Sequence, residues 1–274
     1  MKQRILSGAV LVLFFAAVIV FNSSFPLALT IVVALISATS VMELVKALGL
    51  ERKWFLFGPA VAAAAAVPFC THDLEFLVYC IFTLLVFSAM IVYHKETTFK
   101  EVGVLYSMVV LIPSALQTLV SLRSLGGKHG MFLVLIAVLS AWVADAGAYF
   151  AGTFFGKHKL CPNISPKKTV EGAVGGVIVD VIIMLLCGVA FSQLYYGGAV
   201  GVNYPVLLLI GLFGSVLSIM GDLSFSLIKR SCHIKDFGQV IPGHGGILDR
   251  FDSVIFTAPF VYILVGFLPL VPAY

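Results

Sequence analysis

Long apolar runs that recur along the whole chain constrain its fold most strongly. A helix needs about 20 apolar residues to cross a hydrocarbon core about 30 Å thick, and runs of this kind recur from residue 5 to residue 270. The mean hydropathy is +1.10 and charged residues make up 11% of the chain, whereas soluble domains carry about 25%. The alternating pattern of a membrane barrel is missing, and open strand edges are costly in lipid. The sequence therefore predicts an all-α polytopic integral membrane protein.

We expect about nine transmembrane helices, of which the third is the shortest. They are expected at residues 5–21, 26–48, 54–69, 74–93, 102–122, 130–155, 171–194, 204–229 and 249–270. Two cations precede the first run, but no small-residue cleavage site follows it, so we interpret it as an uncleaved helix. We expect residues 1–125 to form a scaffold of about five spans and residues 126–274 to form a catalytic transmembrane region.

The cations are distributed asymmetrically, and short cytoplasmic loops of membrane proteins carry an excess of Lys and Arg. Nine spans with a cytoplasmic N-terminus and an outside C-terminus leave only Arg123 and Lys128, of 17 cations, on the outer side. The other cations then lie inside: Lys2, Arg4, Lys46, Arg52, Lys53, Lys95, Lys100, Lys157, Lys159, Lys167, Lys168, Lys229, Arg230, Lys235 and Arg250. This topology places the protein in the cell membrane, with the polar loops 156–171 and 230–248 facing the cytoplasm.

Carboxylates within or at the ends of expected spans are the main chemical signal. A charged group inside a span costs roughly 2.5–3.5 kcal/mol on insertion scales, and so it suggests a functional role. Asp145, Asp222, Asp249 and Asp252 come from three expected helices and could converge in one cytoplasm-facing cavity. Clustered carboxylates without Cys or paired His ligands favour a hard cation, Mg²⁺ in particular when phosphate completes its shell. The five cysteines show no metal-binding spacing and are expected to be reduced.

Basic and hydroxyl side chains close to these acids predict a site for phosphate groups. Asp222, Ser226 and Lys229 are spaced to share one stripe of a helix. Gly245 and Gly246 permit close backbone approach before the last expected helix, which suits an anion. The other candidate phosphate ligands are Ser165, Lys167, Lys168, Thr169, Arg230, Lys235 and Arg250.

Two stretches of this polar region resemble a known family. Residues 226–252, which we call the signature segment, read SLIKRSCHIKDFGQVIPGHGGILDRFD and resemble throughout the signature of phosphatidate cytidylyltransferases, or CDP-diacylglycerol synthases. Residues 145–149 and 165–172 are similar to an upstream region of the same family. By motif the resemblance covers the C-terminal half, whereas the N-terminal spans match in hydropathy and number alone.

The resemblance implies transfer of CMP from CTP to phosphatidic acid with Mg²⁺, at the cytoplasmic face of the membrane. It implies that Asp222 and Asp249 bind the metal, with Asp145 and Asp252 as further candidate ligands. Lys229, Arg230 and His244 are the other candidate catalytic residues; His244 would act as a general acid or base, or alternatively as a hydrogen-bond donor. The resemblance also implies a homodimer and no nucleic-acid partner, and whether a second cation joins Mg²⁺ stays open.

Several alternatives remain at this stage. The protein could activate another lipid phosphate, such as that of an ether lipid, or it could use its acids as the midplane site of an ion transporter. Asp222 and Asp249 could be structural acids paired with lysines, Asp145 could pair across helices, and Asp252 could form a salt bridge. Glu43 and Asp180 are interpreted as packing or interfacial groups. The motifs of P-loop kinases and of CDP-alcohol phosphotransferases are missing from the sequence.

Overall fold

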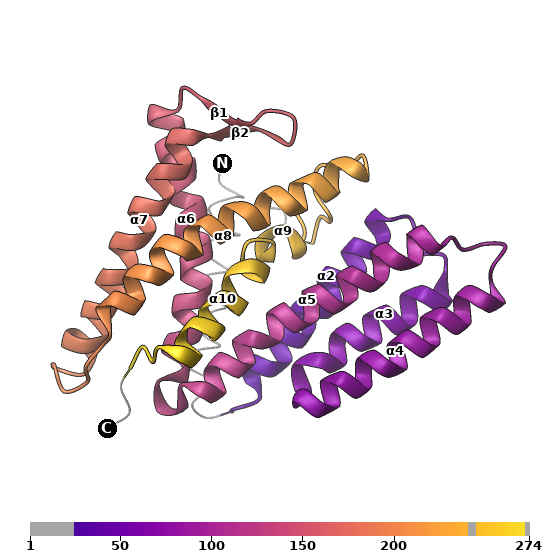
Figure 1. Cartoon of the computed structure of the whole chain (residues 1–274), viewed down its shortest axis with the longest axis horizontal. Coiled ribbons are helices and arrows are strands. Elements are labelled where there is room, and N and C mark those ends of the chain that lie inside the picture. The colour runs from indigo at the N-terminus through magenta and orange to yellow at the C-terminus, as the bar shows by residue number, and fades with distance from the viewer. Residues whose placement is uncertain (1–24, 241–244, 272–274) are drawn as a thin grey trace. The chain divides into compact units, whose positions relative to one another are not determined.

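The computed structural model describes residues 25–240 and 245–271 of the chain (Figure 1). The first expected span and His244 lie outside the described residues. Within them, seven helices are long and apolar enough to cross a membrane, and an eighth, Trp54–Phe69, is apolar but shorter. This arrangement confirms an all-α polytopic membrane protein. The count of nine spans and the orientation of the termini stay predictions.

The helices follow the expected spans closely. They are α2 (Ala28–Ala47), α3 (Trp54–Ala66), α4 (His72–Val92), α5 (Phe99–Leu125), α6 (Gly130–Phe155), α7 (Val170–Val189), α8 (Tyr204–Ser231), α9 (Leu248–Phe251) and α10 (Val254–Phe267). Shorter turns are η1 (Val67–Phe69), η2 (Gly127–His129) and the π-helix η3 (Ala190–Tyr195), which extends α7. The last expected helix differs, because α9 ends at Phe251 and Asp252 and Ser253 separate it from α10.

The chain folds into two compact units, which we describe separately. Of the described residues, the first comprises those up to Val120 and those between Ser231 and Phe251, and the second comprises Ser121–Arg230 and those from Asp252 on. Most of the loop after α8 therefore belongs to the first unit. The division into a scaffold, 1–125, and a catalytic region, 126–274, stays a prediction.

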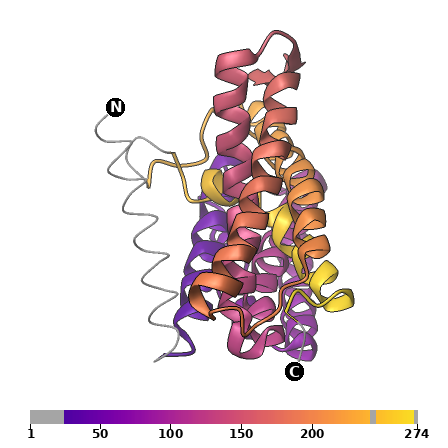
Figure 2. The same ribbon diagram turned by 90° about the vertical axis from the view of Figure 1, so that its left-hand side faces the viewer.

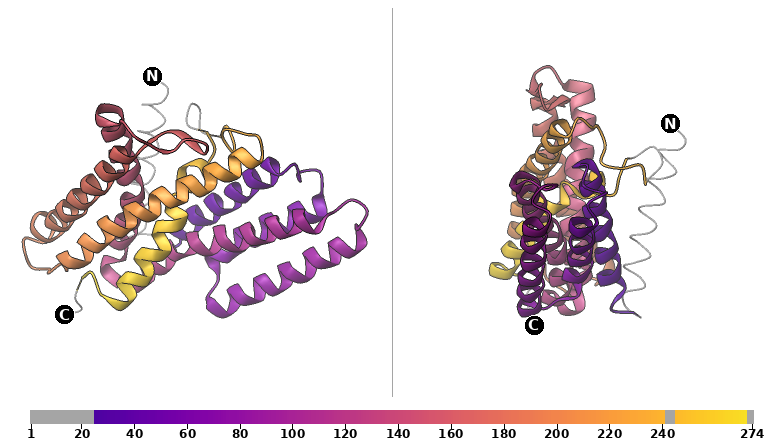
Figure 3. Two further views of the ribbon diagram at one scale, coloured as in Figure 1. Left: turned by 45° about the horizontal axis from the view of Figure 1, so that its top comes forward. Right: turned by 90° about the vertical axis from the view of Figure 1, so that its right-hand side faces the viewer.

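In the first unit, α3 packs against α2 and α4 (Figure 3). Polar contacts also connect α4 to α5, because the Tyr79 hydroxyl lies 2.6 Å from Ser114 Oγ and Ser114 Oγ donates to Glu75 Oε1 at 2.7 Å. Hydrogen bonds of this kind fix helices that share an apolar environment. Much of α4 is exposed apolar surface, as expected of a helix that faces lipid.

In the second unit, α6 and α7 lie side by side along their length (Figure 2). Small residues bring the two backbones together, since a Cβ added at Gly176 would lie 2.8 Å from the carbonyl oxygen of Ala144. α10 packs against α6, and the Gly221 position of α8 lies directly against Asp252 and Ser253. These contacts bring α6, α8 and the start of α10 to one polar site.

The polar loop between α6 and α7 forms a β-hairpin, which the sequence did not predict. β1 (Lys159–Cys161) pairs antiparallel with β2 (Ser165–Thr169), with Lys159 opposite Thr169 (Figure 2). Glu171 closes the hairpin by accepting hydrogen bonds from the backbone N–H groups of Lys157 and His158 at 3.0 and 3.1 Å. These contacts connect the start of the hairpin to the first turn of α7.

Candidate active site

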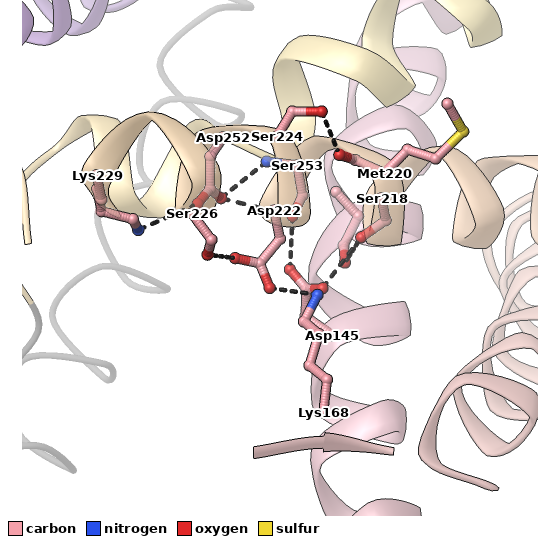
Figure 4. A network of polar contacts seen from close by, with 11 residues as sticks. Asp145, Lys168, Ser218, Met220, Asp222, Ser224, Ser226, Lys229, Asp252 and Ser253 are labelled. Atoms are coloured by element: carbon pink, nitrogen blue, oxygen red, sulfur yellow. Dashed lines mark hydrogen bonds and ion pairs between the residues drawn. The ribbon is translucent and has the colours of Figure 1, made fainter. Parts of the chain in front are cut away.

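Three aspartates of the second unit form the centre of the candidate site. Asp145 comes from α6, Asp222 from α8 and Asp252 from the turn before α10 (Figure 4). Together with Lys168 and Lys229 they form what we call the acidic cluster. Because each aspartate comes from a different part of the chain, the packing of α6, α8 and α10 decides their proximity.

Asp145 is held by two hydroxyl groups. Ser218 Oγ of α8 donates to Asp145 Oδ1 at 3.1 Å, and Ser253 Oγ donates to Asp145 Oδ2 at 2.8 Å (Figure 4). Ser218 and Ser253 are both buried. Hydroxyl donors stabilise a carboxylate without neutralising it, so Asp145 keeps its capacity to accept from a cation or a further donor.

Asp222 is paired with a lysine from the hairpin. Lys168 Nζ and Asp222 Oδ2 form an ion pair, and Ser226 Oγ donates to Asp222 Oδ1 at 3.3 Å. The sequence predicted the stripe of Asp222, Ser226 and Lys229, but not which lysine of the hairpin meets it. Neighbouring side chains of a strand point to opposite faces, and accordingly Lys168 is half-buried while Lys167 is exposed.

Asp252 lies at the third corner of the cluster. Its Oδ2 lies 3.9 Å from Lys229 Nζ, and its Oδ1 accepts from the backbone N–H of Ser253 at 2.8 Å. Asp252 and Lys229 are both buried. A salt bridge was one of the two roles considered for Asp252, and the structure identifies Lys229 as its partner.

Asp249 belongs to the first unit and is described with it. Its Oδ2 accepts hydrogen bonds from the backbone N–H groups of Phe237 at 2.8 Å and Gly246 at 2.9 Å. Gly245 has a φ of 84°, a conformation that glycine adopts without strain. A Cβ added there would lie 2.9 Å from Asp249 Oδ2. Asp249 is thus fixed within the glycine-rich part of the signature segment.

The remaining predicted site residues differ in their surroundings. Thr169 is buried and caps α7, because its Oγ1 accepts from the backbone N–H of Gly172 at 3.1 Å. Lys235 and Arg230 are exposed, while Ser165 and Arg250 are half-buried. These four residues are not part of the acidic cluster as defined above.

Sequence reasoning did not predict the contacts of three residues in or near the site. Ser218 and Ser253 bind Asp145, and Glu43 of α2 accepts from the backbone N–H groups of Ile247 and Leu248 at 2.9 Å each. A signal existed for Ser218, which stands four residues before Asp222 and so shares its helix face. No local pattern indicated that Glu43 binds a segment more than 200 residues away.

The acidic cluster has the donor chemistry of a hard-cation site. Among the described residues, no group of three or more His, Cys, Asp or Glu side chains is arranged to hold a metal ion by itself. Mg²⁺, however, usually binds through one or two carboxylates and completes its shell with water and substrate phosphates. Carboxylates beside lysines inside an apolar bundle therefore define a polytopic membrane protein with a site suited to phosphate and Mg²⁺.

Comparisons with known proteins identify the family. Residues 2–268 match the cytidylyltransferase family, and this protein belongs to that family. It is similar to the phosphatidate cytidylyltransferase of Bacillus subtilis (strain 168), at 33% identity over 278 residues, which covers 97% of this chain and 98% of that protein.

Two shorter matches to proteins of the same name were also found. The protein of Staphylococcus haemolyticus is 44% identical over 139 residues, covering 50% of each chain. That of Haemophilus influenzae is 40% identical over 135 residues, covering 48% of this chain and 45% of its own.

Proposed function

We propose that this protein transfers CMP from CTP to phosphatidate, giving CDP-diacylglycerol and diphosphate. The observation that carries the proposal is the acidic cluster, with two lysines among three aspartates in an apolar bundle. It is supported by the similarity, over nearly the whole chain, to a protein named phosphatidate cytidylyltransferase. Both substrates carry phosphate groups, and phosphatidate is a membrane lipid. A polar site within a polytopic membrane protein suits such a reaction.

The reaction needs no nucleophile from the protein. A phosphate oxygen of phosphatidate forms a bond to the α-phosphorus of CTP, the bond to the bridging oxygen breaks, and diphosphate leaves with the electron pair. Catalysis then consists of positioning two anions and stabilising the charge of the leaving group. Lys168 and Lys229 are suited to this role because each already faces an acid that holds its ammonium group in place.

Mg²⁺ is part of the proposal, with Asp222 and Asp249 as its ligands and Asp145 and Asp252 as additional candidates. Bound Mg²⁺ would neutralise phosphate charge and orient the oxygens of CTP. The fit rests on the donor set, which contains carboxylate and hydroxyl oxygens, the ligands that Mg²⁺ prefers. A second cation and a homodimer, both considered from the sequence, belong to the same proposal.

The proposed location is the cell membrane with the site open to the cytoplasm, where CTP is available. The charge asymmetry of the loops supports this orientation. In the proposed orientation the loops 156–171 and 230–248 face the cytoplasm, and phosphatidate would enter from the lipid.

The decisive experiment measures diphosphate release by the purified protein in detergent from CTP, with and without phosphatidate, over a range of Mg²⁺ concentrations. Release that requires phosphatidate and Mg²⁺, with CDP-diacylglycerol as the second product, is the expected result. Release with an ether-lipid phosphate but not with phosphatidate would transfer the proposal to that substrate. A folded protein that releases no diphosphate from either would overturn it.

A further inference from the structure

Glu43 binds the backbone of the signature segment although it lies in a different helix. It stands near the C-terminal end of α2, where α9 packs against that helix (Figure 1). Its Oε1 accepts from the N–H of Ile247 and its Oε2 accepts from the N–H of Leu248, each at 2.9 Å. Both carboxylate oxygens are thus used, and the side chain is only 5% exposed.

Asp249 binds the same stretch of backbone from the other side. Its Oδ2 accepts from the N–H groups of Gly246 and Phe237. The consecutive amides of residues 246, 247 and 248 are therefore taken up by two carboxylates, Asp249 for the first and Glu43 for the next two. Movement of the Glu43 carboxylate would release the peptide groups that immediately precede Asp249.

Two glycines leave the space that Glu43 occupies. A Cβ added at Gly238 would lie 2.7 Å from the Glu43 carboxyl carbon, and one added at Gly246 would lie 2.6 Å from the same atom. Such distances are too short for real atoms, so any larger residue at either position would displace the carboxylate. The glycines of this loop thus serve the contact with Glu43 as well as backbone conformation.

A role in packing alone does not account for this arrangement. A buried carboxylate is costly unless hydrogen bonds satisfy it, and an apolar side chain could fill the same space at lower cost. Among the described residues, the N–H groups that donate to Glu43 are those of Ile247 and Leu248, which immediately precede Asp249. Outer-shell groups that orient a metal-binding side chain commonly influence metal affinity and activity by about 10–100-fold.

We propose that Glu43 is a positioning residue that holds the loop before α9 so that Asp249 is correctly placed for the reaction. The effect on catalysis rests on the proposed function, in which Asp249 binds Mg²⁺. The effect on the loop does not, because it concerns hydrogen bonds within the first unit. The two can therefore be tested separately.

The first test measures hydrogen exchange in Glu43→Gln. The glutamine side chain has the size of Glu, but an NH₂ group replaces one of the two accepting oxygens. This NH₂ group would face a backbone N–H, so one hydrogen bond is lost and one contact becomes repulsive. We expect faster exchange in the peptides that contain residues 236–240 and 245–249, including the amides of Phe237 and Gly246, which Asp249 binds. Faster exchange only at 247 and 248, or none, would overturn the positioning role.

Glu75→Gln is the matched control. Glu75 is also a hydrogen-bonded acid of the first unit, but it accepts from Ser114 and lies in α4, away from the signature segment. The Glu75→Gln variant should leave hydrogen exchange at residues 236–249 unchanged. Equal effects of both variants on this loop would show a general loss of stability and overturn the proposal.

The second test measures the steady-state kinetics of Glu43→Gln. Glu43→Gln should lower kcat and weaken the apparent affinity for Mg²⁺ by about 10–100-fold, while the KM for phosphatidate stays unchanged. An unaltered Mg²⁺ dependence would overturn the proposal. If the unaltered protein makes no CDP-diacylglycerol, the proposed function fails, whereas hydrogen exchange still decides whether Glu43 holds the loop.

A second variant covers the case in which Glu43→Gln does not fold. Gly238→Ala keeps the charge of Glu43 and displaces its carboxylate. Gly103→Ala in α5 is its control, because nothing lies within 4 Å of a Cβ added there. Gly238→Ala should reproduce the faster exchange at residues 245–249 and the weaker Mg²⁺ dependence, and Gly103→Ala should not. Normal exchange and kinetics in Gly238→Ala would overturn the proposal.

Discussion

Lys168 of β2 forms an ion pair with Asp222 of α8 in the second unit, and both side chains are about three-quarters buried, with 21% and 26% exposed. The pair connects the hairpin between α6 and α7 to the acidic cluster (Figure 4). Lys167, the neighbouring lysine, is exposed. The two lysines, which look equivalent in the sequence, therefore have different surroundings.

Lys168→Ala should lower kcat/KM for CTP by about 100-fold, the order found when one charge-stabilising group is removed from a site. The loss follows because Asp222 loses its ionic partner and the cluster loses a cation. Steady-state kinetics of diphosphate release measure it. Lys159→Ala on β1 is the control, since Lys159 is exposed on the same hairpin. Equal losses in the two variants would indicate a general effect of charge on the hairpin.

Asp222→Asn and Asp249→Asn should each abolish turnover while the protein stays folded, because a neutral amide cannot replace a carboxylate as a Mg²⁺ ligand. Product formation and thermal unfolding in detergent measure the two effects. Asp73→Asn, at an exposed position at the start of α4, should change neither. A near-normal rate in Asp222→Asn or Asp249→Asn would remove that residue from the proposed metal site.

Thr169→Val should destabilise the protein by about 1 kcal/mol, because the valine cannot accept the N–H of Gly172 at the start of α7. The corresponding fall in Tm is roughly 2–4 °C for a protein of this size. Thr169→Ser keeps the accepting oxygen and should keep the Tm. If Thr169→Ser instead lowers CTP use while stability is unchanged, then Thr169 also binds substrate, as its sequence context predicts.

Gly176→Val should destabilise the second unit by about 1–3 kcal/mol, as overpacking of a close contact usually does. The added Cβ would lie 2.8 Å from the carbonyl oxygen of Ala144, so α6 and α7 must separate. Activity should fall as well, because Asp145 directly follows Ala144 in α6. Thermal unfolding is compared with Gly103→Val, where the space is open; similar effects would point to helix propensity rather than packing.

The predicted topology can be tested with single-cysteine variants and a membrane-impermeant maleimide. Cys161 and Cys232 should react only from the cytoplasmic side and Cys70 only from the outer side. Burial raises the pKa of the Cys70 thiol, so its thiolate fraction at neutral pH is small and its labelling should rise with pH. Labelling of Cys70 and Cys161 from one side would contradict the nine-span arrangement.

The sequence by itself determined the class of fold and the place of most helices. The described spans agree with those expected from hydropathy. The thickness of the bilayer sets the length of a spanning helix, and an apolar run of that length can be found from local sequence alone. Asp145 and Asp222 could also be selected in advance, since a carboxylate in an apolar helix is costly. The signature segment, a continuous stretch, indicated the family before any coordinates.

Only the tertiary structure decided which of these groups meet. The pairing of Lys168 with Asp222, the hydroxyls of Ser218 and Ser253 on Asp145, and the binding of residues 247 and 248 by Glu43 all join distant parts of the chain. A helix that is apolar on nearly every side carries little information about its rotation or its partners. Packing of small residues and backbone hydrogen bonds fix those choices, and they exist only in the folded chain.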